Sequence, residues 1–439
     1  MSSSDFDVVI IGAGAAGLAA FTELNRAGCK VICLEARDRI GGRILTIRDP
    51  LAPVPIELGA EFVHGRSPQI WNIIHSAPLA AYDCAENAVH IEHGEIQRDG
   101  DAWELVGQVM DDMQKRAAEG ADETFSSFLD QSPHPQNAKA VAASYVEGFN
   151  AARKEVIGIA SLAQDARAAD EIDGDRSFRI LNGYDSLMLH LINGVDDVRS
   201  KLRLSSVVEE IRWQPGSAVV HTGHRETFRA RKVIVAVPLG VLQAEPDAPG
   251  TIRFSPQTGN LLAAARELRF GQVIRIALRF REAFWEKNPD FSNAGFLFSD
   301  QQFFPTWWTT LPLHAPIVTG WSAGPHADGL LDQPRSNVIQ HAIADLGSIT
   351  KTTPQRLNAL LEAAYLHDWH ADPFARGAYS YVPAGALEAR KTLAQPVENT
   401  LYFAGEATEL TGHSATVHGA IASGKRAARQ VLERVPVNA

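Results

Sequence analysis

The 439-residue chain contains few cysteines and lacks long hydrophobic runs. Cys29, Cys33 and Cys84 are too few and too irregularly spaced for a disulfide framework or a thiolate metal site, which indicates a reducing compartment. No stretch reaches the roughly 18 apolar residues of a membrane span, and the N-terminus shows neither a basic region nor a cleavage site. These absences predict a cytoplasmic protein with no membrane partner.

Dense runs of lysine or arginine are also absent, and the formal net charge is −11. A nucleic-acid partner is therefore not expected. Hydrophobic residues make up 45% of the chain and charged residues 21%. This composition favours a compact globule of two or three domains with a large core.

The N-terminal stretch DVVIIGAGAAGLAAFTELNRAGCKVICLEA reads as strand, tight turn, helix and second strand. Gly12, Gly14 and Gly17 fit the spacing G-x-G-x-x-G, and Glu35 follows the second strand. Gly12 permits the turn, Gly14 lets a pyrophosphate approach the helix N-terminus, and Gly17 allows close packing of the helix on the sheet. Glu35 would accept hydrogen bonds from an adenosine ribose. The pattern predicts a dinucleotide-binding unit.

A second glycine turn follows at once in RDRIGGRI, with Gly41, Gly42 and Arg43. An additional arginine can hold a pyrophosphate from its far side, which favours a flavin dinucleotide over a nicotinamide one.

The rest of the chain predicts an α/β fold with an interrupted nucleotide domain. Residues 101–171 show helical periodicity, and strand patterns return at KLRLSSVVEEIRW, RKVIVAVPLGVL, GQVIRIALRF, GFLFSD, QQFFPTWWTTL and APIVTGWSAG. The last four predict a second, mostly antiparallel sheet. We expect a discontinuous nucleotide-binding domain and an inserted substrate domain, with the division 1–75, 200–265 and 395–439 against 76–199 and 266–394.

Five ordered blocks resemble the flavin-containing amine oxidases, a family that includes monoamine oxidases, polyamine oxidases and lysine-specific histone demethylases. They are IELGAEFVHG, VIVAVPLGVLQ, RFGQVIRIALRFREAFW, WHADPFARGAYSYV and LYFAGEATELTGHSATVHGAIASGKRAAR. The resemblance implies FAD held by both chain ends in a Rossmann-like domain similar to that of para-hydroxybenzoate hydroxylase.

The resemblance also assigns cofactor contacts. The expected set is Gly12, Gly14, Ala15, Ala16, Gly17, Glu35, Ala36, Arg37, Gly42, Arg43, Gly59, Ala60, Glu61, Phe62, Val208, Gly405, Glu406, Thr416 and Val417. Monoamine oxidases attach FAD through a cysteine before a tyrosine, and here the matching residue is Ala378. The resemblance thus implies non-covalent FAD.

The implied reaction is hydride transfer from the carbon beside an amine to flavin N5, giving an imine that hydrolyses to a carbonyl compound. Oxygen is the expected acceptor, with hydrogen peroxide as product. An apolar pocket would favour the uncharged amine. Candidates for its wall and the catalytic site are Tyr379, Trp369, Thr416, His64 and either Trp307 or Trp308. His90, His93, His314, His326 and His341 show no metal-ligand spacing, so no metal is expected.

Arg275 stands where the family has a lysine that reaches flavin N5 through a water and assists reoxidation or imine hydrolysis. Arginine is planar and stays protonated, so the exchange is not conservative. Arg275 could preserve the charge near N5, slow the reaction with oxygen so that another acceptor serves, or mark lost amine oxidation. Because Val273, Arg275 and Ala277 share a strand face, an outward-facing arginine is disfavoured.

Three alternatives stay open from the sequence. One is an amine dehydrogenase with a non-oxygen acceptor. Another is a flavin desaturase or an enzyme like protoporphyrinogen oxidase, which the blocks LGAEFVHG and ATVHGA disfavour. The third is a non-catalytic flavin-binding protein. The expected assembly is a monomer or a homodimer.

Overall fold

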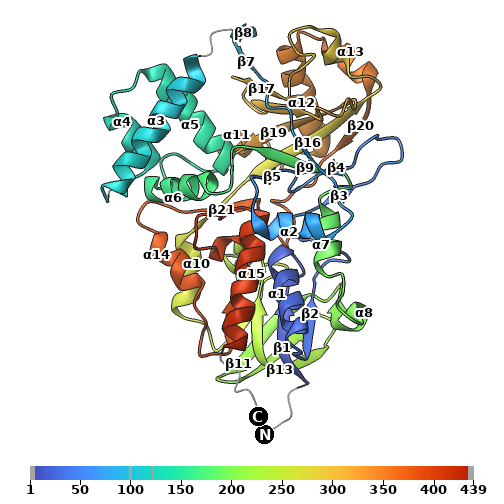
Figure 1. Ribbon diagram of the computed structural model, residues 1–439, viewed down its shortest axis with the longest axis vertical. Coiled ribbons are helices and arrows are strands. Elements are labelled where there is room, and N and C mark those ends of the chain that lie inside the picture. The colour runs from blue at the N-terminus through green and yellow to red at the C-terminus, as the bar shows by residue number, and fades with distance from the viewer. Residues whose placement is uncertain (1–4, 98–100, 121, 434–439) are drawn as a thin grey trace.

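The computed structural model describes residues 5–97, 101–120 and 122–433. It contains two large β-sheets, one in the lower and one in the upper half of the view in Figure 1, with a group of helices beside the upper sheet. The two ends of the chain lie together at the bottom of that view. Among the described residues, none of the helices combines the length and the apolar character needed to cross a membrane.

The lower sheet has the strand order β10-β2-β1-β13-β12-β11-β14, and β22 also pairs with β13. The core of this sheet is parallel, since β1 pairs in parallel with β2 and β13, and β22 is parallel to β13. The bounds are β1 Phe6–Ile11, β2 Val31–Leu34, β10 Leu202–Arg203, β11 Val208–Gln214, β12 Ser217–Thr222, β13 Thr227–Val235, β14 Arg253–Ser255 and β22 Leu401–Phe403.

Both faces of β1 are covered, which explains its unbroken apolar sequence. Val8 and Ile10 belong to the core under helices α1 (Ala15–Arg26) and α15 (Val417–Leu432), while Val9 and Ile11 belong to the core on the opposite face. Helices α1 and α15 pack side by side, so residues near the two chain ends build one surface next to the first glycine turn.

The upper sheet has the order β20-β16-β19-β18-β17-β7-β8 and is mostly antiparallel, as the sequence predicted. Among the described strand pairs of this sheet, only β17 with β7 is parallel. The bounds are β7 Ala88–Glu92, β8 Glu95–Gln97, β16 Val273–Phe280, β17 Phe296–Ser299, β18 Thr306–Thr309, β19 Ile317–Ala323 and β20 Leu361–Tyr365.

Strand β16 differs from the half-buried strand that its alternating sequence predicts, because all eight of its residues are buried. One face, with Ile274 and Ile276, packs into the core beneath helix α12 (Arg335–Thr350). The other face carries Arg275 and Arg279, each held in ion pairs inside the protein. The arginines on this face of β16 therefore point toward carboxylate partners, and the alternating pattern does not mark a solvent-exposed face.

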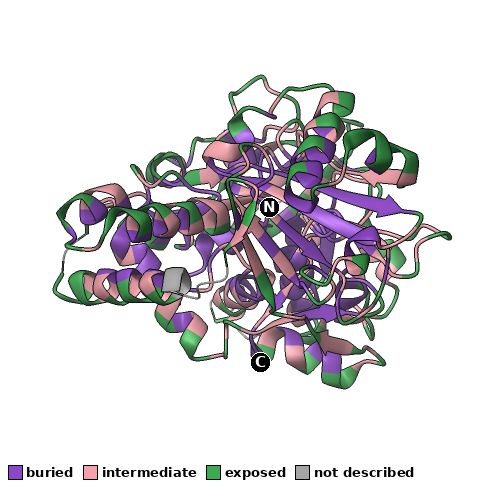
Figure 2. Ribbon diagram, turned by 90° about the horizontal axis from the view of Figure 1, so that it is seen from above, coloured by how far each residue is buried: buried purple, intermediate pink, exposed green. Residues whose placement is uncertain are grey.

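The helices expected over residues 101–171 are present and share a core of their own. They are α3 Asp101–Ala118, α4 Phe125–Gln131, α5 Gln136–Asn150 and α6 Ile159–Asp170. This helical group stands beside the upper sheet in Figure 1, and the view in Figure 2 shows its buried side turned inward and its exposed residues turned outward.

Two helices from the expected substrate region pack on the lower half of the molecule. Helix α7 (Asp185–Leu191) contributes Leu187 and Met188 to the core under α1, and α14 (Leu387–Leu393) packs on α10 (Asn260–Glu267).

The remaining elements are β3 Thr46–Ile47, β4 Ile56–Glu57, β5 Val63–His64, α2 Pro68–Ser76, β6 Ala81–Asp83, β9 Ser177–Ile180, α8 Val198–Lys201, α9 Leu239–Leu242, β15 Arg269–Gly271, η1 Phe284–Lys287, α11 Pro325–Asp328, α13 Pro354–Leu360, β21 Tyr379–Tyr381 and η2 Glu406–Thr408.

Candidate functional site

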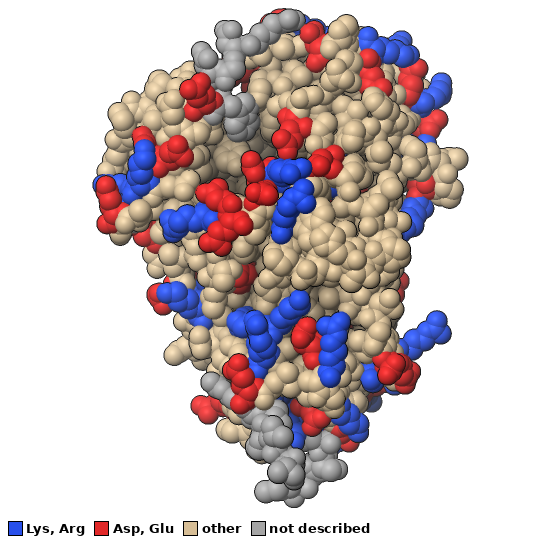
Figure 3. All heavy atoms as spheres, in the orientation of Figure 1, with Lys and Arg blue, Asp and Glu red and all other residues tan. Residues whose placement is uncertain are grey.

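A cavity of about 1280 Å³ extends from the first glycine turn, through the region between the two sheets, to strands β7, β17 and β18. It exceeds the ~300–1,000 Å³ of an ordinary small-molecule site, so a large cofactor and a substrate can share it. Figure 3 shows the surface hollowed near the helical group, with acidic side chains around the hollow. Glu86, Glu92 and Asp300 are exposed acidic residues that line the cavity.

The glycine turn after β1 forms one end of this cavity. Gly12 has φ +99°, a left-handed conformation that favours glycine, and Gly14 caps α1 without a side chain. No acidic residue occupies the first turn of α1, so its free N–H groups and positive dipole are available to an anion. A Cβ on Gly17 would lie 1.8 Å from the Gly12 carbonyl oxygen, which confirms that Gly17 serves helix packing.

Glu35 follows β2 and lies beside the same turn. Its carboxylate accepts hydrogen bonds from the backbone N–H groups of Ala13 (2.6 Å) and Arg37 (2.9 Å), and only 3% of the residue is exposed. Arg37 in turn pairs with Asp372 at 2.7 Å. These contacts fix an acidic group at the cavity wall, where a ligand hydroxyl could reach it.

The second glycine turn lies directly against the first. Gly14 and Gly41 form a backbone bridge, and the Cβ that Gly42 lacks would lie 3.3 Å from the Gly14 Cα. Gly41 and Gly42 both have positive φ angles, +99° and +59°. The close approach of two glycine turns leaves backbone atoms exposed to the cavity, which is the form of a cradle for a phosphate group.

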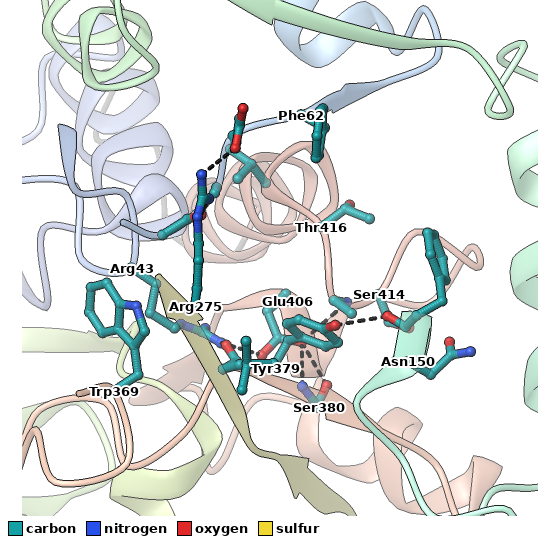
Figure 4. A pocket seen from close by; sticks show the side chains of 18 of the residues that line it. Arg43, Phe62, Asn150, Arg275, Trp369, Tyr379, Ser380, Glu406, Ser414 and Thr416 are labelled. Carbon is teal, nitrogen blue, oxygen red and sulfur yellow. Dashed lines mark hydrogen bonds and ion pairs between the residues drawn. The ribbon is translucent and has the colours of Figure 1, made fainter. Parts of the chain in front are cut away.

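Arg43 and Glu406 join three distant segments at the cavity wall (Figure 4). Arg43 donates to Glu406 at 3.0 Å and to the carbonyl oxygen of Ala378. The other carboxylate oxygen of Glu406 accepts from the Ser380 hydroxyl at 2.6 Å and from the N–H groups of Ser380 and Ala415 at 3.3 and 3.2 Å. Glu406 is thus fully hydrogen-bonded and 4% exposed.

Arg275 rises from β16 toward the loop that carries Phe62 (Figure 4). Its Nη1 donates to the Gly59 carbonyl oxygen at 2.7 Å, and its Nη2 donates to the Glu61 carboxylate. The planar guanidinium therefore binds both ends of the segment 59–61, which a single ammonium group cannot match in geometry. Its buried Nε finds no acceptor in the described part of the chain, although Arg275 lines the cavity.

Glu61 is shared by two arginines and a tryptophan. Arg179 Nε donates to its carboxylate at 2.5 Å and the Trp308 indole N–H at 3.0 Å, in addition to Arg275. Burial alone would raise the pKa of Glu61, but the guanidiniums of Arg179 and Arg275 bring it below its usual value. Glu61 is therefore ionised, and we call Arg179, Glu61 and Arg275 the arginine–glutamate cluster.

Glu57 lies close to this cluster but binds other groups. Its carboxyl accepts from the Tyr184 N–H at 2.8 Å and bonds the Thr46 hydroxyl at 2.7 Å, and burial raises its pKa to about 7. Because the folded state holds this proton more tightly than the unfolded chain, stability is lost as pH rises from the ordinary glutamate range through about 7.

We therefore expect Glu57→Gln to stabilise the protein increasingly as pH rises, since an amide keeps both contacts without the buried charge. The expected gain near pH 8.5 is on the order of 1–3 kcal/mol, and it should vanish near pH 4. Urea unfolding of both proteins across this range tests it. A pH-independent difference between the two would contradict the assignment.

Aromatic side chains line the cavity beside Arg275. Phe62 contacts Trp308 edge-on with ring centroids 5.3 Å apart, Trp308 contacts Trp321 at 5.8 Å, and all three line the cavity. Trp307, the alternative candidate, points to the other face of β18 and belongs to the core, where its indole bonds the Phe304 carbonyl.

The other candidate aromatics also reach the cavity. Trp369 donates to the Leu58 carbonyl oxygen at 2.7 Å and lies against the loop at Gly59. Tyr379 donates its hydroxyl to the Phe149 carbonyl at 2.8 Å, and this contact fixes its ring in the cavity lining (Figure 4). Tyr145 and Phe149 of α5 complete this section of the lining.

His64 and Thr416 lie in the same cavity but make different contacts. Burial lowers the pKa of His64 to about 4, so its imidazole is neutral, with Nδ1 3.4 Å from the Ser177 hydroxyl. The Thr416 hydroxyl accepts from the Gly419 N–H at 3.0 Å and donates to the His413 carbonyl at 2.7 Å. Capping of α15 thus accounts for the hydroxyl of Thr416.

Apart from Gly17 and the alternative candidate Trp307, the expected site residues all line the same cavity. Sequence reasoning missed Arg179, Ser380, Tyr145, Phe149 and Trp321, because strands and helices distant in the sequence bring them here. No group of three or more His, Cys, Asp or Glu side chains in the described ranges is placed to hold a metal ion.

Comparisons with known proteins identify the family of this chain. The profile of the family described as flavin containing amine oxidoreductase matches residues 15–432. Polyamine oxidase 4 of Oryza sativa subsp. japonica is 27% identical, over 98% of this chain and 89% of its own length. Lysine-specific histone demethylase 1 homolog 3 of Arabidopsis thaliana is 26% identical over 97% of this chain, which spans only 30% of that protein.

The solved structure of putrescine oxidase bound to putrescine has the same mixed α/β fold. It superimposes with a TM-score of 0.82 and 21% identity, covering 98% of this chain and 99% of that one. The family profile covers nearly the whole sequence. The chain therefore belongs to the flavin-containing amine oxidoreductases, and it is an FAD-dependent enzyme that oxidises amines.

Proposed function

We propose that this protein binds FAD without a covalent link and oxidises a primary or secondary amine, with oxygen as the electron acceptor and hydrogen peroxide as a product. The observation that carries the proposal is the single cavity that joins the paired glycine turns to an aromatic chamber at Arg275. A cofactor extending from one end of the cavity would bring its reactive ring to the substrate at the other.

The residues at the cradle suit FAD. Gly12, Gly14 and Gly42 would let the pyrophosphate approach the backbone, and the N-terminus of α1 would stabilise its charge. Glu35 would bind the adenosine ribose, and Val208 would meet the adenine. The two turns and the strand order of the lower sheet favour a Rossmann-like domain of the para-hydroxybenzoate hydroxylase type. Its main segments would be 1–75, 200–265 and 395–439, and helices α7 and α14 from the expected substrate segments pack on it as well.

The absence of a cysteine at the position that carries FAD in monoamine oxidases supports non-covalent binding. Ala378 offers no nucleophile, and Cys29, Cys33 and Cys84 are absent from the residues that line the cavity in the described ranges. We expect acid precipitation to release all of the yellow cofactor into the supernatant. Flavin absorbance that stays with the precipitated protein would contradict this prediction.

Bound FAD would supply a two-electron acceptor for the hydride on the carbon beside the amine nitrogen, and the imine product would be hydrolysed to a carbonyl compound and a released amine. The aromatic walls and the permanent charge of Arg275 disfavour an ammonium ion in the chamber, so they favour the reactive, uncharged amine. Neutral His64 can hydrogen-bond that nitrogen. The unpaired Nε of Arg275 can donate to a water or to an acceptor on the cofactor.

Anaerobic mixing of the yellow protein with primary and secondary amines tests the proposal. The flavin absorbance near ~450 nm should bleach with a substrate and recover when air is admitted. Bleaching without recovery would indicate a dehydrogenase with another acceptor. Failure of every amine to bleach the flavin would overturn amine oxidation.

A further inference from the structure

The arginine–glutamate cluster carries an unbalanced charge. Two guanidiniums share one carboxylate, so the cluster of Arg179, Glu61 and Arg275 has one surplus positive charge. The three residues are buried, with 8%, 9% and 5% of their side chains exposed. Such a charge is only weakly screened by solvent and salt.

The surplus charge lies on the cavity side. Arg275 and Glu61 line the cavity, whereas Arg179 lies behind them and donates to the carbonyl oxygens of Thr309 and Leu311. The Arg179 guanidinium also lies 4.8 Å from the Phe62 ring centroid, and Arg179 is not among the described residues that line the cavity. Arg275 is therefore the member that a bound cofactor would face.

We infer that the arginine–glutamate cluster sets the reduction potential of the bound flavin, with Arg275 supplying the positive charge and Glu61 both positioning and partly neutralising it. The inference rests on the proposed flavin site. A reduced flavin carries more negative charge than an oxidised one, so a buried cation beside it favours reduction.

Replacing either Arg275 or Glu61 breaks the same contact but changes the net charge in opposite directions, so the two variants distinguish an electrostatic effect from a structural one. Arg275→Gln removes the positive charge and should make the flavin harder to reduce. Glu61→Gln removes the negative charge and should make it easier to reduce. Each change should shift the equilibrium constant of reduction at least tenfold, which is about 30 mV for a two-electron couple. A merely structural contact would shift both variants in the same direction, or neither.

Two further variants serve as matched controls. The double variant Glu61→Gln with Arg275→Gln retains Arg179 and so keeps one net positive charge, and its potential should return toward the wild-type value. Arg275→Lys keeps the charge without the forked geometry and should change the potential less than Arg275→Gln. Glu57 faces the cluster, so the measurement belongs at about pH 5.5, where Glu57 is protonated.

The experiment is dye-coupled reductive titration of the FAD-loaded proteins. Opposite shifts in the single variants, with recovery in the double variant, would establish the inference. Shifts in the same direction, or unchanged potentials, would overturn it. If Glu61→Gln fails to retain FAD, equal potentials for Arg275→Gln and Arg275→Lys would overturn it, and a lower potential for Arg275→Gln alone would support it. A yellow protein that no amine bleaches would refute the proposed function but leave this titration decisive.

Discussion

Gly17→Ala is expected to prevent stable folding of the N-terminal unit, whereas Gly14→Ala is expected to fold and to bind FAD weakly. The new Cβ at residue 17 would lie 1.8 Å from the Gly12 carbonyl oxygen, so α1 must move away from β1. Such overpacking of backbone on backbone should cost about 3 kcal/mol or more.

At residue 14 the nearest atom to a new Cβ is the Gly42 Cα at 3.9 Å, an ordinary contact. The fold can therefore accept alanine, but the methyl group would stand where a pyrophosphate approaches the backbone. We expect at least a tenfold increase in the Kd for FAD, about 1.4 kcal/mol, with unchanged stability of the apoprotein. Thermal unfolding and FAD titration measure the two effects. Wild-type stability of Gly17→Ala, or wild-type affinity of Gly14→Ala, would contradict these assignments.

Glu406→Gln is expected to lower both stability and FAD occupancy. The carboxylate accepts hydrogen bonds from Arg43 on one oxygen and from Ser380 and Ala415 on the other. An amide must present a donor to one of these groups, which leaves donors facing each other and Arg43 without its counter-charge. Arg43 is partly exposed, so solvent can stabilise some of its uncompensated charge. We expect the free energy of unfolding to fall by about 2–3 kcal/mol.

Glu388→Gln provides the control for this change. Glu388 pairs with Lys391 on α14, and 79% of its side chain is exposed. Its replacement should change the free energy of unfolding by less than about 0.5 kcal/mol. Denaturant unfolding and the ratio of flavin to protein absorbance report on both variants. Equal behaviour of the two would show that Glu406 does not join the three segments that it contacts.

The contacts of Arg275 give a physical reason for arginine at this position. Its two terminal nitrogens bind the Gly59 carbonyl and the Glu61 carboxylate together, and the carboxylate is also bound by Arg179. The single ammonium group of a lysine could not donate to both of these acceptors in the same geometry, so one of the two hydrogen bonds would be lost. Arg275 is 4% exposed, so it does not face outward, in agreement with the face that it shares with Val273 and Ala277 on the strand.

The local patterns were sufficient for several features of the molecule. Glycine spacing, an apolar strand and a helical repeat predicted the β1–α1–β2 unit, since turn conformation and strand burial depend on neighbouring residues. The periodicity of residues 101–171 likewise predicted helices, and four helices occupy that region. Nearly all of the site residues that the family resemblance implied line one cavity.

The tertiary structure alone decided which side chains meet. Arg179 contacts Glu61 across 118 positions of sequence, and Arg275 contacts it across 214. Likewise, the choice between Trp307 and Trp308 depended on which face of β18 meets the cavity. Sequence periodicity shows that two faces of a strand differ, but the packing of sheets and loops determines whether a polar face meets water or a buried partner.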